Sequence, residues 1–177
     1  MKAPHGRRSM RLPGFNYASP GAYFVTICSA DRKPIFGEVV AGEACPNEVG
    51  RIVESVWRSL PSDFRFLETA AFILMPNHLH GILILSDAVG AKHSALSDAS
   101  PLRIGPRGTS RGSLAAIIQN LKSISTRRIR RLGLLGDAPV WQRGYYEHVI
   151  RGDANLARIQ AYIEQNPARW EEDEYFV

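Results

Sequence analysis

Cysteine is scarce in this chain of 177 residues, which contains only Cys28 and Cys45. The two lie too far apart for a zinc knuckle, and they are too few for the disulfide framework of a small secreted protein. Long apolar runs are also missing, since none reaches the roughly 18 to 20 residues that cross a membrane. The basic N-terminus has no apolar segment behind it and is therefore not expected to be a secretory signal. These absences predict a cytoplasmic protein with free thiols and no membrane association.

Acidic residues are outnumbered, and the formal net charge is +5. The acids gather at 171–174, whereas many arginines fall between 103 and 143. A basic surface suits a polyanionic partner such as nucleic acid, although a solvated basic face explains the charge equally well. Most of the cluster also lies at the end of an expected helix, where the helix dipole favours cations. Our candidates for contacts to nucleic-acid phosphates are Arg127, Arg128, Arg130, Arg131 and Arg143.

The stretch 72–85 carries the first chemical signal. Two apolar runs flank a Pro-Asn turn, and the second run opens with His78, Leu79 and His80. In a strand the two histidines point to the same face, while Leu79 points into the opposite layer. Two adjacent imidazoles can hold one divalent metal ion. The alternative, that each ring only forms hydrogen bonds with neighbouring backbone, stays open at this point.

The hydrophobic pattern predicts alternating strands and helices. Continuous β-branched runs indicate buried strands, and apolar residues at every third or fourth position indicate helices. The expected strands cover 23–28, 66–75, 78–85 and 140–150, the last interrupted at Gly144, and a loop is expected through Pro34 and Gly37. The expected helices are capped by Asn47, Ser113 and Asp153, and they end at Leu60 before Pro61, at Arg131, and before Pro167.

This order of elements predicts an α+β fold. Strand, helix, strand, strand, helix, strand is the pattern of a ferredoxin-like split βαβ sheet, here with one appended C-terminal helix. We expect a single domain over 1–177, since no internal repeat is visible. The segments 1–19 and 86–112 lack periodicity and are expected to be a flexible arm and a mobile insertion.

The C-terminal helix carries Tyr162 and Asn166, four residues apart on one flank of its apolar stripe. A side-chain amide oxygen can ligate a hard cation, and a tyrosine hydroxyl beside a metal can act as a nucleophile toward phosphate. The plain alternative is a half-buried tyrosine at a helix edge and an asparagine that ends the helix before Pro167.

Three stretches together resemble the HUH single-strand endonucleases, where U is a bulky apolar residue. More narrowly, the chain resembles the REP-associated tyrosine transposases. The matching stretches are LMPNHLH at 74–80, WQRGYYEH at 141–148 and YIEQNP at 162–167. They follow the family's order and span most of residues 20–170.

The resemblance implies a metal-dependent enzyme that nicks and rejoins single-stranded DNA near a hairpin. It implies that Tyr162 attacks the scissile phosphate, becomes linked to the 5′ phosphate and releases a 3′-OH. His78 and His80 would hold a Mg²⁺ or Mn²⁺ ion, and Asn166 matches the position of a third ligand, which differs among relatives. The implied partner is single-stranded hairpin DNA, bound by a monomer or a homodimer.

Other readings of the sequence remain. A domesticated, non-catalytic hairpin-binding protein could keep the same fold and motifs. A ferredoxin-like nucleic-acid module would stack bases on strand aromatics such as Tyr23, Phe24 or Phe72. A histidine-triad hydrolase needs a third alternate histidine, where this chain has Ile82. The role of His148, within the second matching stretch, is open between the metal site and the core.

Overall fold

The structure is a computed structural model that describes residues 19–86 and 112–176. The expected arm and insertion lie almost wholly outside these ranges, and the single-domain organisation stays a prediction. Within the described ranges, no helix is long and apolar enough to cross a membrane. The strands are β1 (Gly21–Cys28), β2 (Gly37–Val40), β3 (Glu43–Pro46), β4 (Leu67–Leu74), β5 (His78–Leu85) and β6 (Tyr146–Ile150). The helices are α1 (Glu48–Asp63), α2 (Leu114–Arg131) and α3 (Asp153–Gln165), with short 3₁₀ helices η1 (Ala30–Arg32) and η2 (Pro167–Glu172).

Four strands form one antiparallel sheet in the order β4-β5-β1-β6. β5 lies between β1 and β4, and both of these strands pair with it in the antiparallel sense. β1 and β4 are therefore parallel to each other across β5, which is the split βαβ arrangement. The predicted ferredoxin-like α+β fold is confirmed.

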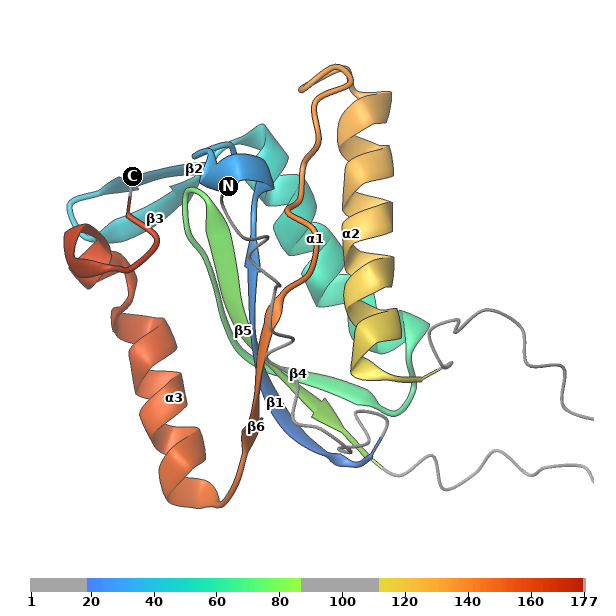
Figure 1. Ribbon diagram of the computed structural model, residues 1–177, viewed down its shortest axis with the longest axis vertical. Coiled ribbons are helices and arrows are strands. Elements are labelled where there is room, and N and C mark those ends of the chain that lie inside the picture. The colour runs from blue at the N-terminus through green and yellow to red at the C-terminus, as the bar shows by residue number, and fades with distance from the viewer. Residues whose placement is uncertain (1–18, 87–111, 177) are drawn as a thin grey trace, which may run out of the picture.

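The sheet is covered on both faces. Figure 1 shows α1 and α2 on one side of the sheet and α3 on the other. Alternation along β1 sends Tyr23 and Val25 into the core under α1 and α2, and sends Phe24 to the opposite face. There Phe24 packs in a smaller cluster with Ile82 and with Ile163 of α3. The apolar cluster on the α3 face is thus the smaller of the two, and the histidines of β5 lie on this face.

The predicted helices form where expected, with two differences at their ends. α1 begins after Asn47, whose side chain accepts a hydrogen bond from Gly50 N–H, but it continues through Pro61 to Asp63. Pro61 has no N–H to donate to the Trp57 carbonyl, but the helix continues past it, and Phe64 N–H still donates to Leu60 O at 3.0 Å. α3 has Gly152 as its N-cap, without a side-chain cap, so the prediction that Asp153 caps it is wrong.

Two strand predictions also need correction. The loop expected through Gly37 is instead the β2–β3 hairpin, whose turn residues Ala41 and Gly42 both have positive φ. Such a turn matches the twist of the strands, but it lacks the usual Asn-Gly signal. The strand expected over 140–150 is regular only as β6. Its first part makes a single isolated bridge, between Trp141 and Ser29.

We expect Gly81→Ala to destabilise the fold by about 1–3 kcal/mol, a typical cost of overpacking a core. A Cβ on Gly81 would collide with the outer ring atoms of Trp57, which lies against this point of β5. Denaturant unfolding measures the loss. Trp57→Phe removes the colliding atoms, so Gly81→Ala should cost less in that background. An equal cost in both backgrounds would contradict the collision.

Candidate active site

His78 and His80 lie on the α3 face of β5, while Leu79 packs in the core on the other face. Both histidines are buried, with 0% and 1% of their surface exposed. Their Nε2 atoms are 3.0 Å apart, so the two rings point at one place. The structure therefore brings together the two imidazoles that the sequence singled out.

The tautomer of His78 is fixed by Asn77. Asn77 Nδ2 donates to two backbone carbonyls, Arg32 O at 3.0 Å and Tyr175 O at 2.7 Å. These contacts turn the amide oxygen toward His78, whose Nδ1 lies 2.8 Å from Asn77 Oδ1. An amide oxygen only accepts, so His78 Nδ1 carries the proton and Nε2 presents a lone pair.

His80 has a partner that allows either tautomer. Its Nδ1 lies 2.9 Å from Thr26 Oγ1, and Thr26 is directly opposite His80 in the β1–β5 ladder. A hydroxyl can donate or accept. His80 Nε2–H can thus donate to His78 Nε2, or the proton can move to Nδ1 and leave two lone pairs facing a cation. Partners of this kind orient metal-binding histidines in other proteins.

Both imidazoles are neutral at neutral pH. Burial lowers the pKa of His78 to about 3, with a further contribution from Arg32. Burial likewise lowers the pKa of His80 to about 3, with a further contribution from His78. Neutral imidazole is the form that binds metal ions.

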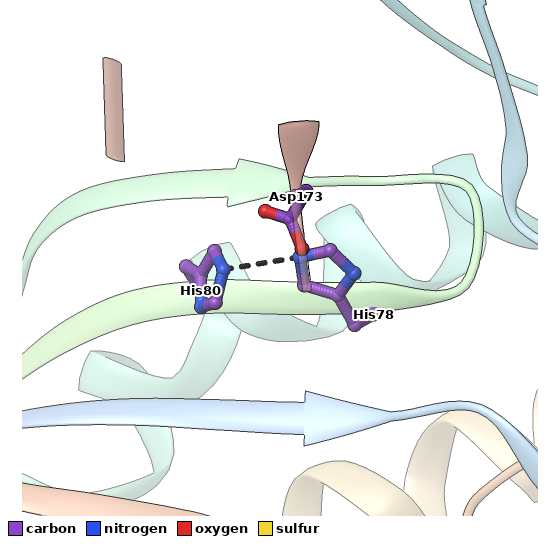
Figure 2. A group of neighbouring side chains, drawn as sticks. All are labelled: His78, His80 and Asp173. Atoms are coloured by element: carbon purple, nitrogen blue, oxygen red, sulfur yellow. Dashed lines mark hydrogen bonds between the residues drawn. The ribbon is translucent and has the colours of Figure 1, made fainter. Parts of the chain in front are cut away.

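Asp173 is the third member of the cluster, and the sequence analysis missed it as a site residue. One ligand atom from each of His78, His80 and Asp173 lies within 4.8 Å of the others. Figure 2 shows the Asp173 side chain at the His78 ring, with the His80 ring beside it. Two imidazoles and a carboxylate are a donor set that proteins use for divalent transition metals. The 3.0 Å between the Nε2 atoms also matches the spacing of neighbouring ligands around an octahedral ion with bonds of about 2.1 Å.

Asn166 is buried and attached to this cluster through Asp173. Its Nδ2 donates to Asp173 Oδ2 at 2.6 Å. Its Oδ1 is buried and has no hydrogen-bond partner within the described ranges. The predicted role of Asn166 as a direct metal ligand stays a prediction, and its observed contact orients the Asp173 carboxylate.

Tyr162 reaches the histidines from α3. Its Oη lies 3.2 Å from His80 Nε2, and its ring centroid is 5.2 Å from that of His80. Burial raises the pKa of Tyr162 to about 12, with further contributions from Asp173 and Glu174. The phenol is therefore protonated at neutral pH, and a nearby cation would favour its ionised form.

The segment after η2 closes one side of the cluster. The Tyr175 ring packs against His78 at 4.6 Å between centroids, and the Arg32 guanidinium lies 5.1 Å from the centre of the Tyr175 ring. Trp170 packs against His78 from farther away, at 5.9 Å. The C-terminal stretch that the sequence marks only by its acidic residues thus belongs to the site.

The five candidate arginines separate into groups. We name residues 139–145 the strap. A groove of about 650 Å³ lies between α2 and the strap, and it is lined by Arg127, Arg130 and Arg143. Arg128 instead points toward α1, where its Nη1 lies 3.5 Å from Ser55 Oγ. Arg131 is exposed at the end of α2.

The strap is fixed to α2 by two residues of the helix. Lys122 Nζ donates to the backbone carbonyls of Gln142 and Gly144. Trp141 Nε1 donates to Ser125 Oγ at 2.9 Å. These contacts between the strap and α2 therefore hold Arg143 beside the arginines of the helix.

Comparison with known proteins gives the chain its relatives. No protein-family model matches it. An uncharacterised protein of Haemophilus influenzae is 35% identical over 173 residues, covering 98% of this chain and 94% of the relative. The chain belongs to the same family as this protein.

A solved structure of a REP-associated tyrosine transposase bound to a REP hairpin matches with a TM-score of 0.58 and 18% identity. The match covers 91% of this chain and 74% of the transposase. The chain has the REP-associated tyrosine transposase fold. In this fold the described residues bring the paired histidines of β5 and the tyrosine of α3 into contact.

We expect Thr26→Val to weaken the affinity for Mn²⁺ about tenfold, because valine has the same shape but no oxygen to hold His80 Nδ1–H. Isothermal titration calorimetry measures the affinity. Thr26→Ser keeps the hydroxyl and should bind as the parent protein does, and His80→Ala sets the lower limit. Equal affinity in the valine and serine variants would contradict the role of Thr26.

Proposed function

We propose that this protein is a metal-dependent single-strand DNA endonuclease of the transposase type, which nicks and rejoins DNA next to hairpins. The observation that carries the proposal is the 3.2 Å contact between Tyr162 Oη and His80 Nε2, beside the paired Nε2 atoms. The proposed nucleophile and the candidate metal site thus lie next to each other. The fold of the hairpin-bound transposase supports the choice of DNA as substrate.

His78, His80 and Asp173 are the residues that would hold one divalent ion, Mg²⁺ or Mn²⁺. When bound, the ion withdraws charge from the scissile phosphate and lowers the pKa of a neighbouring phenol. Asn166 holds the carboxylate in place through its hydrogen bond to Asp173. Its unpartnered Oδ1 leaves room for the ligand role that the sequence suggests.

Tyr162 is the proposed nucleophile. Its oxygen attacks phosphorus, the bond to the 3′ oxygen breaks, and the protein becomes linked to the 5′ phosphate. The phenol gives up one proton and the departing 3′ oxygen gains one, so one phosphate diester is exchanged for another. Attack by a 3′-OH reverses the step and rejoins the strand without ATP.

The groove lined by Arg127, Arg130 and Arg143 is the proposed track for the hairpin backbone. Its guanidinium groups suit phosphate contacts. We do not favour a non-catalytic hairpin-binding protein, because binding alone has no need of a neutral histidine pair beside a phenol.

We expect Tyr162→Phe to bind hairpin DNA and Mn²⁺ but to form no covalent adduct, since the variant lacks the attacking oxygen. Denaturing gels with a labelled hairpin oligonucleotide in the presence of Mn²⁺ detect the adduct. Tyr145→Phe and Tyr146→Phe are the matched controls and should keep substantial adduct formation. An adduct that survives Tyr162→Phe would mean that another residue is the nucleophile.

We expect Arg127→Ala, Arg130→Ala and Arg143→Ala each to weaken hairpin binding. Each variant should also lower the slope of log affinity against log salt concentration by about one, because one phosphate contact is lost. Fluorescence anisotropy at several salt concentrations measures both quantities. Arg128→Ala is the matched control, because this arginine has the same charge on the same helix but points toward Ser55. Equal losses in all four variants would indicate a diffuse charge effect rather than a track.

A further inference from the structure

A cavity of about 930 Å³ adjoins the active site on the α3 face of the sheet. Two facing rows of side chains line it. Tyr146 and His148 are two residues apart on β6 and so point to one face, and Arg158 and Tyr162 are four residues apart on α3. Tyr162 belongs to both the cavity and the active site, so an occupant of the cavity would lie next to the scissile phosphate.

Phe24 forms the aromatic floor of this cavity. Its ring stacks on His80 at 5.3 Å, and it meets Tyr146 and Tyr162 edge to face at 6.3 Å and 6.1 Å. Phe24 is 8% exposed, whereas Tyr146 and Tyr162 keep 36% and 42% of their surface exposed. The two tyrosines thus present open ring surface on either side of a covered floor, which suits a flat ligand.

Two polar groups in the cavity lack partners. His148 Nε2 is buried and makes no hydrogen bond with any described residue. Arg158 is exposed and forms no ion pair within the described part of the chain. Buried polar groups are nearly always hydrogen-bonded, so a partnerless imidazole nitrogen on a side chain that lines the cavity points to a missing ligand.

The charge of the cavity favours an anion. Its lining includes the cations of Arg32 and Arg158 and a single carboxylate, that of Glu174, while the third lining arginine, Arg169, is paired with Glu172 at 3.0 Å. The volume lies within the range of small-molecule sites. A ligand that combines a flat ring, hydrogen-bonding edges and a negative charge is a nucleotide.

We propose that this cavity binds one unpaired nucleotide of single-stranded DNA, directly adjacent to the scissile phosphate. The base stacks against Tyr146 above Phe24, His148 forms a hydrogen bond with the base edge, and Arg158 contacts the backbone phosphate. Stacking on aromatic rings is the usual way in which proteins hold unpaired bases. The proposal rests on the proposed function and identifies residues that select the cleavage position.

An abasic scan tests the proposal. Hairpin oligonucleotides with one abasic residue at successive positions are compared for adduct formation with Mn²⁺ and for affinity by anisotropy. We expect a single position, next to the scissile phosphate, at which the missing base costs about tenfold. Tyr146→Ala should cost a similar factor with intact DNA and almost nothing more with that abasic DNA, since the stacking partner is already gone.

Further variants test each contact. Tyr146→Phe keeps the ring and should behave as the parent protein does, which also guards against a folding defect. His148→Phe should remove the preference among the four bases at that position. Arg158→Ala should weaken binding several-fold, whereas Arg151→Ala, an exposed arginine that does not line the cavity, should not.

The outcomes separate the cavity from the catalytic proposal. Losses that simply add for Tyr146→Ala and abasic DNA at every position overturn the nucleotide site. If the parent protein forms no adduct with any DNA, the proposed function fails. The affinity scan then tests the nucleotide site by itself. A single position at which the missing base weakens binding, with that effect lost in Tyr146→Ala, supports the nucleotide site. If no such position exists, the nucleotide site is overturned.

Discussion

The pairing register between β1 and β5 is the constraint on which the site depends. It sets Thr26 directly opposite His80, so that the hydroxyl meets the ring. A slip of one residue would turn the imidazoles into the core and bring Leu79 to the α3 face. On the other side of the sheet, Trp57 fills the space that a side chain at Gly81 would occupy. Packing against α1 therefore helps to fix the chemistry on the opposite face.

The ionisation states of the site residues all suit a bound cation. The histidines are buried and neutral, and the phenol of Tyr162 stays protonated beside Asp173 and Glu174. A divalent cation would satisfy all of these groups at once: it takes the lone pairs, offsets the carboxylate and favours the ionised phenol. Without a cation, the lone pair of His78 Nε2 depends on the one proton that His80 Nε2 can donate. This agreement is the physical reason for preferring a metal centre to a packed histidine pair.

Much of the fold was predictable because it depends on local pattern. Strand alternation placed His78 and His80 on one face, and the apolar stripe of α1 was plain in the sequence. The β2–β3 hairpin was missed because its turn is Ala-Gly, and helical residues 61–63 were missed because Pro61 was expected to stop the helix.

The partners of the site were less predictable because they are set by tertiary contacts. Asp173 reaches the histidines only because η2 turns the chain back after Asn166, and because Asn77 binds the Tyr175 carbonyl. Thr26 becomes a partner of His80 only through the strand register. None of these contacts leaves a periodic signal, so sequence reasoning found the paired histidines and the tyrosine but not the residues that surround them.

The attachment of the strap has a consequence for how such proteins diverge. Lys122, whose pKa burial lowers to about 8, holds the strap through the backbone carbonyls of Gln142 and Gly144 rather than through side chains. Every amino acid supplies the same carbonyl, so the exposed side chains at 142 and 143 can change while the strap stays in place. Mutations that alter the surface proposed to contact DNA are thereby uncoupled from those that alter folding, so the chemistry of this surface can change without loss of the scaffold.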